Sequence, residues 1–390
     1  MPVPSARPHA LIVGAGIAGT AAALALRAVG WDATIVERAP ARRRGGYLVF
    51  FRGDGYRAAR RLGVADDLRD RLGPDSRWFE IDRRGRTLPG MRLPADARRR
   101  SLTLLRSDIE AALHDRLPDD VPIRYGRTPV RVSQAPDHVL TTLDDATEIR
   151  SDLLIGADGS HSAVRRLAFG PERAYRYDFG HVVAACMVGR SLPGLATGDT
   201  AVMPDAGRAA WVAGFRDCGP VAYFLYRSDD PGAELRQSSA AVLRRVFGDH
   251  PGPLMPGLLD AAEAAGAVHF DQVSQIRMPR WTDRRVALLG DAAWSLSLYS
   301  AYGACLAVEA AANLADEVAV RDGRPLVRAV AAWERRTRPT ARHHADRARR
   351  MQHLFLPANR QVARVRRAAI RLSHSPLTRP LALRLLPQPL

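Results

Sequence analysis

Residues 10–37 read ALIVGAGIAGTAAALALRAVGWDATIVE, and this stretch decides the fold class. Residues 10–13 form a short apolar run that predicts a buried strand ending at Gly14. Residues 17–29 are rich in Ala and Leu and predict a helix, and residues 33–37 (ATIVE) predict a second strand. A strand, a helix and a second strand in this order form a βαβ unit, which indicates a parallel sheet covered by helices.

The turn of this unit carries a pattern of glycines suited to a dinucleotide. Gly14 permits a tight turn, Gly16 lets the backbone approach a pyrophosphate, and Gly19 allows close packing of helix on strand. The helix N-terminus offers free N–H groups to an anion. Glu37 ends the second strand at the spacing of an acid that bonds a ribose hydroxyl. The predicted contacts are Gly14, Ala15, Gly16, Ile17, Ala18, Gly19 and Glu37, which bind dinucleotides without separating NAD from FAD.

Two further segments have the same form, an apolar strand that ends at a glycine turn. They are SDLLIGADG (151–159) and VALLGDAA (286–293), and both predict strands of the same parallel sheet. RSDIEAALHDRL (106–117) has apolar residues at helical spacing and predicts a helix between them.

Stretches with strand character lie between these segments and predict an inserted antiparallel sheet. Residues 77–93 resemble a hairpin with Gly85 in its turn, and four strands are expected at 181–189, 200–207, 209–215 and 220–227. The predicted domains are a discontinuous dinucleotide-binding domain (1–75, 95–175 and 275–345), a substrate-binding sheet domain (76–94 and 176–274) and a C-terminal helical segment (346–390).

The two later motifs give the chain a family resemblance. Gly156-Ala157-Asp158-Gly159, followed by Ser and Val164-Arg165, resembles the middle motif of the group A flavoprotein monooxygenases, which share the p-hydroxybenzoate hydroxylase fold. Gly290-Asp291 matches their third motif. The resemblance covers essentially the whole chain and implies an FAD-binding domain of the Rossmann-like, glutathione-reductase type, with the inserted sheet and C-terminal helices.

The resemblance also implies roles for individual residues. Asp158 would organise the FAD pyrophosphate region, Asp291 would bond a ribityl hydroxyl, and the following helix would direct its positive end at the flavin. The other implied FAD contacts are Arg38, Arg44, Arg106, Gly303 and Ala304. A helix cap explains Asp158 without a cofactor, a surface position explains Arg106, and a solvated charge run explains the arginines at 42–44.

The segment after Asp291 departs from the family pattern. Members usually continue with Ala-Ala-His, a proline and Gly-x-Gly, whereas this chain has Trp294, Leu298 and Ala301-Tyr302-Gly303. Ala301 restricts φ where glycine is usual. Three interpretations stay open: drift with ordinary monooxygenase chemistry, a flavin retained without oxygen chemistry, and weakened flavin binding.

By resemblance, NAD(P)H reduces the FAD, and a flavin hydroperoxide transfers oxygen to an aromatic or polyketide-type small molecule of secondary metabolism. The residues expected to line the substrate are Met203, Trp211, Phe215, Phe224, Tyr226, Trp294, Leu298 and Tyr299, and packing in the core explains the sheet residues equally. The flavin carries the chemistry in this family, so no catalytic acid or base is assigned. Two alternatives remain: a flavin enzyme that catalyses a non-redox cyclisation, and a non-enzymatic binder.

Composition limits the other possibilities. The chain has 390 residues and a formal charge of +17, and all 58 basic residues are Arg. That charge permits a nucleic-acid or membrane-surface role, but no recognition motif accompanies it, so neither partner is expected. The N-terminus lacks a separate apolar targeting core and no run of 18 apolar residues occurs, which predicts a cytoplasmic protein.

Three cysteines, Cys186, Cys218 and Cys305, fit no disulfide framework or metal pattern. No metal is therefore expected. The oligomeric state, monomer or homodimer, is left open.

Overall fold

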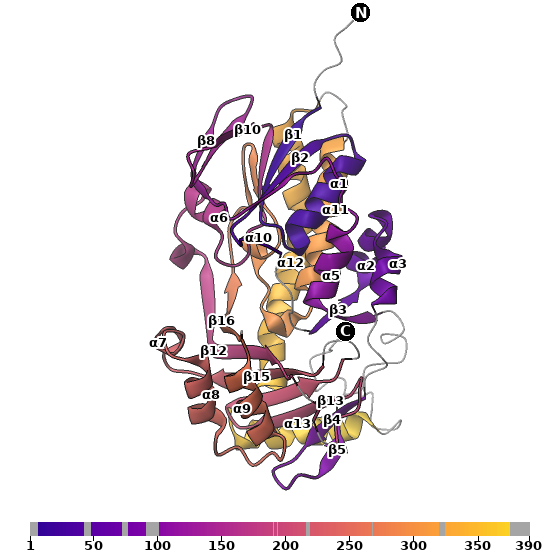
Figure 1. Ribbon diagram of the computed structural model, residues 1–390, viewed down its shortest axis with the longest axis vertical. Helices are drawn as coiled ribbons and strands as arrows, with labels where there is room; N and C mark the ends of the chain where they lie inside the picture. The colour runs from indigo at the N-terminus through magenta and orange to yellow at the C-terminus, as the bar shows by residue number, and fades with distance from the viewer. Residues whose placement is uncertain are drawn as a thin grey trace, which may run out of the picture.

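The computed structural model describes residues 7–42, 48–71, 77–90, 101–189, 191–192, 194–215, 219–266, 268–319 and 324–374. Two large sheets organise them, a six-stranded sheet in the upper half of Figure 1 and a seven-stranded sheet in the lower half. The predicted α/β architecture, with a dinucleotide-binding half, an inserted sheet and C-terminal helices, is confirmed.

The six-stranded sheet has the order β17-β18-β11-β1-β2-β7. Its strands are β1 (His9–Val13), β2 (Asp32–Glu37), β7 (Ile123–Tyr125), β11 (Leu153–Gly156), β17 (Thr282–Asp283) and β18 (Val286–Leu288). All neighbours are parallel except β17 and β18. The carboxyl ends of parallel strands meet at one edge, so the loops after β1, β11 and β18 lie together there.

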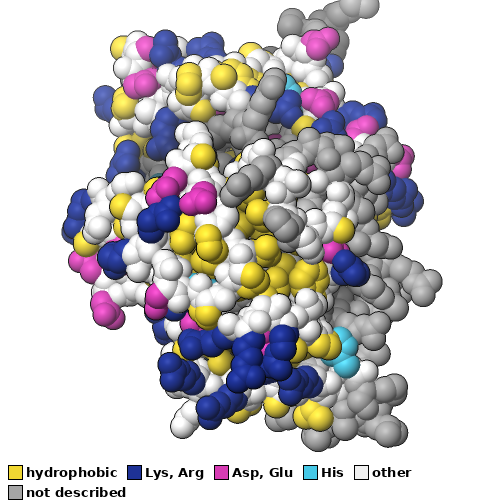
Figure 2. Space-filling model, turned by 60° about the horizontal axis from the view of Figure 1, so that its bottom comes forward, with side chains coloured by type: hydrophobic (Ala, Val, Ile, Leu, Met, Phe, Trp, Pro, Cys, Tyr) yellow, Lys and Arg dark blue, Asp and Glu magenta, His cyan; other side chains and the backbone are white. Residues whose placement is uncertain are grey.

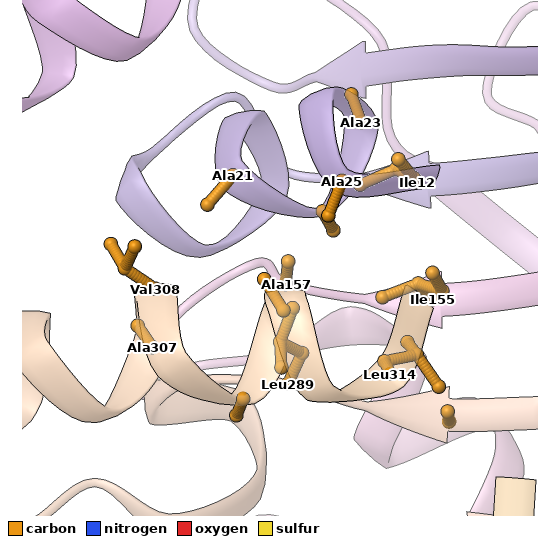
Figure 3. Close-up of a cluster of buried hydrophobic side chains, with 14 of the residues drawn as sticks. Ile12, Ala21, Ala23, Ala25, Ile155, Ala157, Leu289, Ala307, Val308 and Leu314 are labelled. Carbon is orange, nitrogen blue, oxygen red and sulfur yellow. The ribbon is translucent and has the colours of Figure 1, made fainter. Parts of the chain in front are cut away.

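Helices with small side chains cover this sheet. α1 (Ile17–Ala28) packs against α11 (Gly303–Ala319), and Figure 3 shows Ala21 and Ala25 of α1 on the side that faces α11. Alanines let the two helix axes approach closely, which explains the Ala-rich sequence of both. The helices around them are α2 (Gly53–Arg61), α3 (Ala65–Asp70), α5 (Arg106–His114), α6 (Ala163–Ala168) and α10 (Asp291–Trp294).

Two small sheets complete the upper half, and neither was predicted. A three-stranded sheet contains β8 (Pro129–Gln134), β9 (Val139–Leu143) and β10 (Glu148–Ser151). A two-stranded ribbon pairs β3 (Leu48–Arg52) with β6 (Ser101–Leu105) and joins the two halves of the molecule.

The seven-stranded sheet has the order β16-β12-β15-β14-β13-β4-β5. Its strands are β4 (Trp78–Ile81), β5 (Thr87–Pro89), β12 (Arg176–Met187), β13 (Thr200–Asp205), β14 (Arg208–Ala213), β15 (Val221–Arg227) and β16 (His269–Ile276). The four strands expected between 181 and 227 and the hairpin around Gly85 are confirmed. The hairpin joins the sheet through a parallel pair, β4 with β13, so the sheet is mixed rather than purely antiparallel.

Different elements cover the two faces of this sheet. Its outer face packs against α8 (Ser239–Phe247) and α9 (Met255–Ala264). Its inner face packs against β3 and β6 at Leu48 and Leu105, and against the C-terminal helices. One-turn elements lie at Pro231–Glu234 (α7), Glu172–Ala174 (η1) and Leu298–Ser300 (η2).

The C-terminal helices connect the two halves. α12 (Leu326–Phe355) runs from the upper half down to the seven-stranded sheet, and α13 (Arg360–Ser373) lies along the base of the molecule (Figure 1). The expected boundary at 345–346 falls inside α12. The domain limits otherwise stay a prediction.

Candidate functional site

The glycine turn after β1 forms one wall of the site. Gly14 has φ +107°, and a Cβ there would lie 2.4 Å from the carbonyl oxygen of Ala157, so only glycine fits. Gly16 is the N-cap of α1, which has no side-chain cap. A Cβ on Gly16 would lie 3.4 Å from the Arg106 guanidinium and 3.5 Å from Glu110. The result is a cradle of backbone at the start of a helix, which suits a pyrophosphate.

The remaining residues of the glycine motif, Ile17, Ala18 and Gly19, pack inside the protein and do not line the site. Gly19 lies against Gly14, where a Cβ would be only 1.8 Å from its carbonyl oxygen. Ile17 is buried in the core, and Ala18 contacts the backbone at Gly290. Gly14, Ala15 and Gly16 line the cavity described below, which divides the motif into contact and packing positions.

Glu37 ends β2 beside this cradle. Its carboxylate accepts hydrogen bonds from the backbone N–H groups of Ala15 and Ala39, each at 2.8 Å. A carboxylate has further acceptor positions, so it can also accept a bond from a ribose hydroxyl. Glu37 therefore fixes the glycine turn and faces the cavity at the same time.

The second motif places Asp158 at the start of α6. Its carboxylate accepts hydrogen bonds from Ser162 Oγ and from the N–H groups of Ala163 (2.7 Å) and Val164 (3.1 Å). Burial raises the pKa of this carboxyl, and these hydrogen bonds oppose the rise. The side chain is thus used as a helix cap, the alternative that the sequence left open, while Asp158 and its backbone neighbours also line the cavity.

Arg165 was not expected as a site residue, although it belongs to the quoted motif. Its side chain is fully buried, and it donates hydrogen bonds to the carbonyl oxygens of Ala292 (2.9 Å) and Ser160 and to Glu172 (3.0 Å). Its position within α6, four residues after a surface histidine, gave no sign of burial. It connects the second motif to the third.

The third motif brings Asp291 to the opposite wall. Gly290 has φ +66°, and Asp291 starts α10 with its side chain facing the cavity. The surrounding protein removes solvation from this carboxyl and raises its pKa, which the positive charge of Arg106 partly offsets. A Cβ on Gly303, the first residue of α11, would lie 3.9 Å from Asp291 Oδ1. Ala304 follows Gly303 and packs against the core.

Arginines surround the cavity near the glycine turn. Arg38, Arg42 and Arg106 line it, and Arg106 forms an ion pair with Glu110 at 2.7 Å. These guanidinium groups supply positive charge for phosphate groups. Arg44 lies outside the described residues.

The segment from Trp294 to Tyr302 is strained and packs into the core. Ser297 (φ 67°, ψ 163°) and Ala301 (φ 50°, ψ 25°) are both non-glycine residues with positive φ. The Oγ atoms of Ser297 and Ser300 and the Nε1 of Trp294 are buried and have no hydrogen-bond partner among the described residues. Residues in such conformations persist only where surrounding packing holds them, and they cluster at functional sites.

Packing explains the large residues of this segment. Trp294 contacts Trp281, with ring centroids 4.5 Å apart, inside the main core. Tyr299 is buried and forms a 2.6 Å hydrogen bond with His181 Nδ1, and Leu298 packs beside it. None of Trp294, Leu298 and Tyr299 lines the cavity, although the sequence made them substrate candidates.

These walls enclose a cavity of about 1390 Å³. One part lies along the glycine turn, Glu37 and Asp291. The other part extends past Asp158 and His161 to the edge of the seven-stranded sheet, where Ala185, Met187 and the start of β16 line it, together with the end of α9. This volume exceeds the usual range of about 300–1,000 Å³ for one small-molecule site, so the cavity has room for a second ligand.

The sheet side of the cavity was not predicted from the sequence. Ala185, Cys186, Met187, His269, Phe270 and Asp271 are the sheet residues that line it. They belong to β12 and β16, and β16 was not expected as a strand at all. No local sequence pattern distinguishes an edge strand that borders a cavity from one that does not.

The predicted sheet candidates divide between the two faces. Trp211 and Phe215 lie on the inner face, and Trp211 stacks on Tyr223 with ring centroids 5.1 Å apart and an interplanar angle of 10°. Tyr223 accepts a hydrogen bond from the N–H of Leu48 through its hydroxyl oxygen. Neither Trp211 nor Phe215 is among the described residues that line the cavity, but both pack in the cluster that contains Ala185 and Met187 of its wall.

The other three candidates, Met203, Phe224 and Tyr226, are buried on the outer face under α8 and α9. Tyr226 donates a hydrogen bond to Glu234 at 2.6 Å. Because side chains alternate along a strand, neighbouring residues of β15 point to opposite faces. These three pack in the core and do not reach the cavity.

The lining of the cradle consists of glycine backbone, carboxylates and arginines. No group of three His, Cys, Asp or Glu side chains suited to a metal ion occurs in the described part of the chain. The helices described are also too short or too polar to cross a membrane. The glycine turn, the acid at the end of the second strand and the cavity-facing aspartate of the third motif define a dinucleotide-binding protein with a neighbouring ligand compartment.

Comparison with known proteins identifies the dinucleotide. The family model described as FAD binding domain matches residues 7–348. A flavin-dependent monooxygenase of Legionella longbeachae serogroup 1 (strain NSW150) is 27% identical over 332 residues, covering 80% of this chain and 81% of the relative. The 6-hydroxynicotinate 3-monooxygenase of Pseudomonas fluorescens is also 27% identical, over 331 residues, covering 80% of this chain and 82% of its own.

Among solved structures, Klebsiella pneumoniae HpxO complexed with FAD and uric acid superimposes with a TM-score of 0.80 at 24% identity, covering 96% of each chain. That likeness shows a shared fold. The protein belongs to the FAD-binding domain family. It is an FAD-dependent oxidoreductase of the group A monooxygenases, so the resemblance seen in the sequence is confirmed.

Proposed function

We propose that this enzyme uses FAD and NAD(P)H to add one oxygen atom of O2 to an aromatic small molecule. The observation that carries the proposal is the continuity of the cavity, which joins the Gly14–Gly16 cradle to the edge of the seven-stranded sheet. A redox cofactor and a substrate can therefore lie in contact within one cavity.

The cradle fits FAD by its own geometry. Gly14 and Gly16 leave room for a pyrophosphate, Glu37 has acceptor positions for the adenosine ribose, and Asp291 faces the cavity beside Gly303. Arg38 and Arg106 supply positive charge along the same path. When bound there, FAD supplies the hydride-accepting and oxygen-activating chemistry, and the protein holds, orients and shields it.

The second part of the cavity is the proposed substrate compartment. Ala185 and Met187 border it, and they share the inner face with the Trp211–Tyr223 stack. Aromatic and apolar walls bind flat, carbon-rich rings through burial and stacking. The activities printed for relatives, a flavin-dependent monooxygenase and a 6-hydroxynicotinate 3-monooxygenase, support an aromatic substrate. A secondary metabolite of polyketide type is compatible with such walls.

Asp158 and the segment before α11 have supporting roles in the proposed site. Asp158 acts mainly by holding the start of α6, so its effect on FAD is through the backbone of residues 157–160 that faces the cavity. Ser297 and Ala301 keep the segment before α11 in one conformation, which fixes the position of Gly303 relative to Asp291. The enzyme is proposed to work in the cytoplasm.

The test uses the purified full-length protein reconstituted with FAD and a panel of phenols and polycyclic aromatic compounds. The proposal expects a compound that accelerates NAD(P)H oxidation and yields a product one oxygen atom heavier, with that atom derived from ¹⁸O2. A product of unchanged oxygen content, formed while the flavin stays oxidised, would overturn it in favour of a non-redox cyclisation.

A further inference from the structure

The end of the chain has a pronounced charge imbalance. Residues 347–390 contain ten arginines, at 347, 349, 350, 360, 364, 366, 367, 371, 379 and 384, and no Asp or Glu. Most of the net charge of +17 therefore comes from about one ninth of the chain. None of the proposed chemistry uses this segment, so its charge has no role in the site.

One side of α13 is fixed to the protein. Ala369 and Ile370 are buried against the seven-stranded sheet and its neighbours. Arg366 forms an ion pair with Glu80 of β4 at 2.6 Å, and both side chains are at least nine-tenths buried. These contacts hold α13 across the base of the molecule and fix which side faces outward.

The outward side of α13 combines positive charge with apolar side chains. Gln361, Arg364, Val365, Ala368, Arg371 and Leu372 are all exposed, at spacings of three and four residues that form one stripe. Val365 is 69% exposed and Leu372 is 38% exposed, which makes α13 the helix with two of the four exposed large apolar residues among those described. Figure 2, turned to bring the base forward, shows Arg side chains gathered in the lower part of the view.

The arginines of this stripe are available to an outside partner. Within the described ranges, Arg364 and Arg371 of the stripe have no ion pair, and neither do Arg360 and Arg367 beside it. Acidic side chains of the neighbouring strands are already engaged, since Glu80, Asp82 and Asp205 pair with Arg366, Arg86 and Arg83. The protein therefore does not neutralise this surface itself.

Charge decides which occupant fits. A second copy that docked through its own α13 would bring the same basic stripe, and the residues after 374 contain arginines and no Asp or Glu, so neither complements the stripe. The partner must be anionic. Val365 and Leu372 among arginines favour a lipid interface, because bilayers accept both charge and apolar contact. Nucleic-acid surfaces usually add stacking aromatics, and α13 has none.

We propose that the exposed stripe of α13 binds the surface of a membrane rich in anionic phospholipids. The arginines contact lipid phosphates, and Val365 and Leu372 enter the interface between headgroups and acyl chains. The enzyme would then be peripheral to the membrane, with no spanning segment required. The membrane-surface role that the charge alone left open thus has a defined location.

The test is cosedimentation of the full-length protein with vesicles of phosphatidylcholine alone or mixed with phosphatidylglycerol. We expect binding only to the mixed vesicles, with loss of binding as salt is raised. The double variant Arg364→Gln/Arg371→Gln should reduce the partition coefficient by about tenfold or more, since each basic residue near the surface contributes substantially. Val365→Ser/Leu372→Ser should weaken binding while leaving its salt dependence in place.

The matched control is Arg124→Gln/Arg131→Gln, which removes two exposed arginines from the upper half of the molecule. It should leave vesicle binding unchanged. If both double arginine variants lost vesicle binding to the same extent, the proposal would be overturned, because net charge alone would then explain binding. Failure to bind the mixed vesicles, or tighter binding to duplex DNA than to them, would also overturn it.

Discussion

Arg165 donates a hydrogen bond from Nη1 to the carbonyl oxygen of Ala292, 2.9 Å away, although 127 residues separate them in the chain. Arg165 lies on α6, whose first N–H groups donate hydrogen bonds to Asp158 on one wall of the site. Ala292 lies on α10 directly after Asp291, which belongs to the opposite wall. The bond therefore fixes two walls of the FAD site relative to each other. Its guanidinium has no exposure to solvent.

Replacing Arg165 should destabilise the fold. Arg165→Met leaves the carbonyl oxygens of Ser160 and Ala292 without this donor, whereas Glu172 keeps its ion pair with Arg176. The loss should be about 2–5 kcal/mol, since each buried acceptor left without a partner costs about 1–3 kcal/mol. Urea unfolding measures the free energy difference. Arg166→Met, at the next and exposed position, is the control and should change stability by about 0.5 kcal/mol or less. Similar losses in both variants would contradict this role for Arg165.

The two glycines of the cradle should respond differently to substitution. Gly14→Ala places a Cβ 2.4 Å from the Ala157 carbonyl oxygen, so it should destabilise the fold by at least about 2 kcal/mol. Gly16→Val meets only side chains, at 3.4 Å and beyond, so the protein should fold but lose FAD. Flavin absorbance and circular dichroism of the purified variants check both results. A yellow, fully loaded Gly16→Val protein would show that the cradle does not hold the pyrophosphate.

The strained segment before α11 should gain stability from glycine. Ser297→Gly and Ala301→Gly each relieve a positive φ and should stabilise the protein by about 0.5–2 kcal/mol. Thermal and urea unfolding provide the measurement. The control is Ala304→Gly in the first turn of α11, where glycine has no positive φ to relieve. It should lower the free energy of unfolding by up to about 1 kcal/mol. A loss of stability in Ser297→Gly would mean that its side chain supplies more than its backbone costs.

Stability should fall at acidic pH through His181. Burial lowers the pKa of His181 to about 4, so the folded protein binds a proton less readily than the unfolded chain, where the pKa is about 6.5. This contribution is complete above about pH 6.5 and is lost as the pH falls toward 4, by about 3 kcal/mol at most.

Urea unfolding across this range, compared between the wild type and His181→Gln, measures that contribution. The glutamine can still hydrogen-bond to Tyr299 but does not titrate. The difference in unfolding free energy between the two proteins should therefore shrink toward acid. His343→Gln, at an exposed position of α12, should follow the wild type. Parallel curves for wild type and His181→Gln would refute the prediction.

The two faces of the seven-stranded sheet should differ in their effect on substrate. Trp211→Leu removes half of the aromatic stack that packs with Ala185 and Met187 of the cavity wall, and it should weaken substrate binding by up to about tenfold, the equivalent of one lost aromatic contact. Met203→Leu conserves volume on the outer face and should leave binding unchanged. Perturbation of the flavin absorbance during substrate titration is the measurement. Equal effects of the two variants would place the substrate elsewhere.

Much of the dinucleotide half could be predicted because its signals are local. Gly14 needs a positive φ, and Gly19 must lack a side chain because it packs against Gly14. The apolar strands before Gly14, Asp158 and Gly290 pair as neighbours in one sheet. Parallel pairing then brings the three motifs to one edge. At these three motifs the local residue preferences and the strand pairing lead to the same structure, so the sequence alone predicts it.

The substrate side could not be predicted to the same degree. Alternation along β14 and β15 shows that residues divide between faces, but it does not say which face meets the cavity. Trp211 lies on the inner face, whereas Met203 and Phe224 lie under α8 and α9. The cavity-lining residues of β16 and the burial of Arg165 depend on contacts between distant segments. Such contacts have no local pattern in the sequence.

The bound flavin should be redox-active despite the changed segment after Asp291. To measure this, the FAD-loaded protein is mixed anaerobically with NADPH or NADH while the flavin absorbance is followed, and O2 is then admitted. We predict that at least one of the two nucleotides bleaches the oxidised flavin band and that the band returns with oxygen. A flavin that stays oxidised with both nucleotides, in protein that is folded and fully loaded, would contradict it.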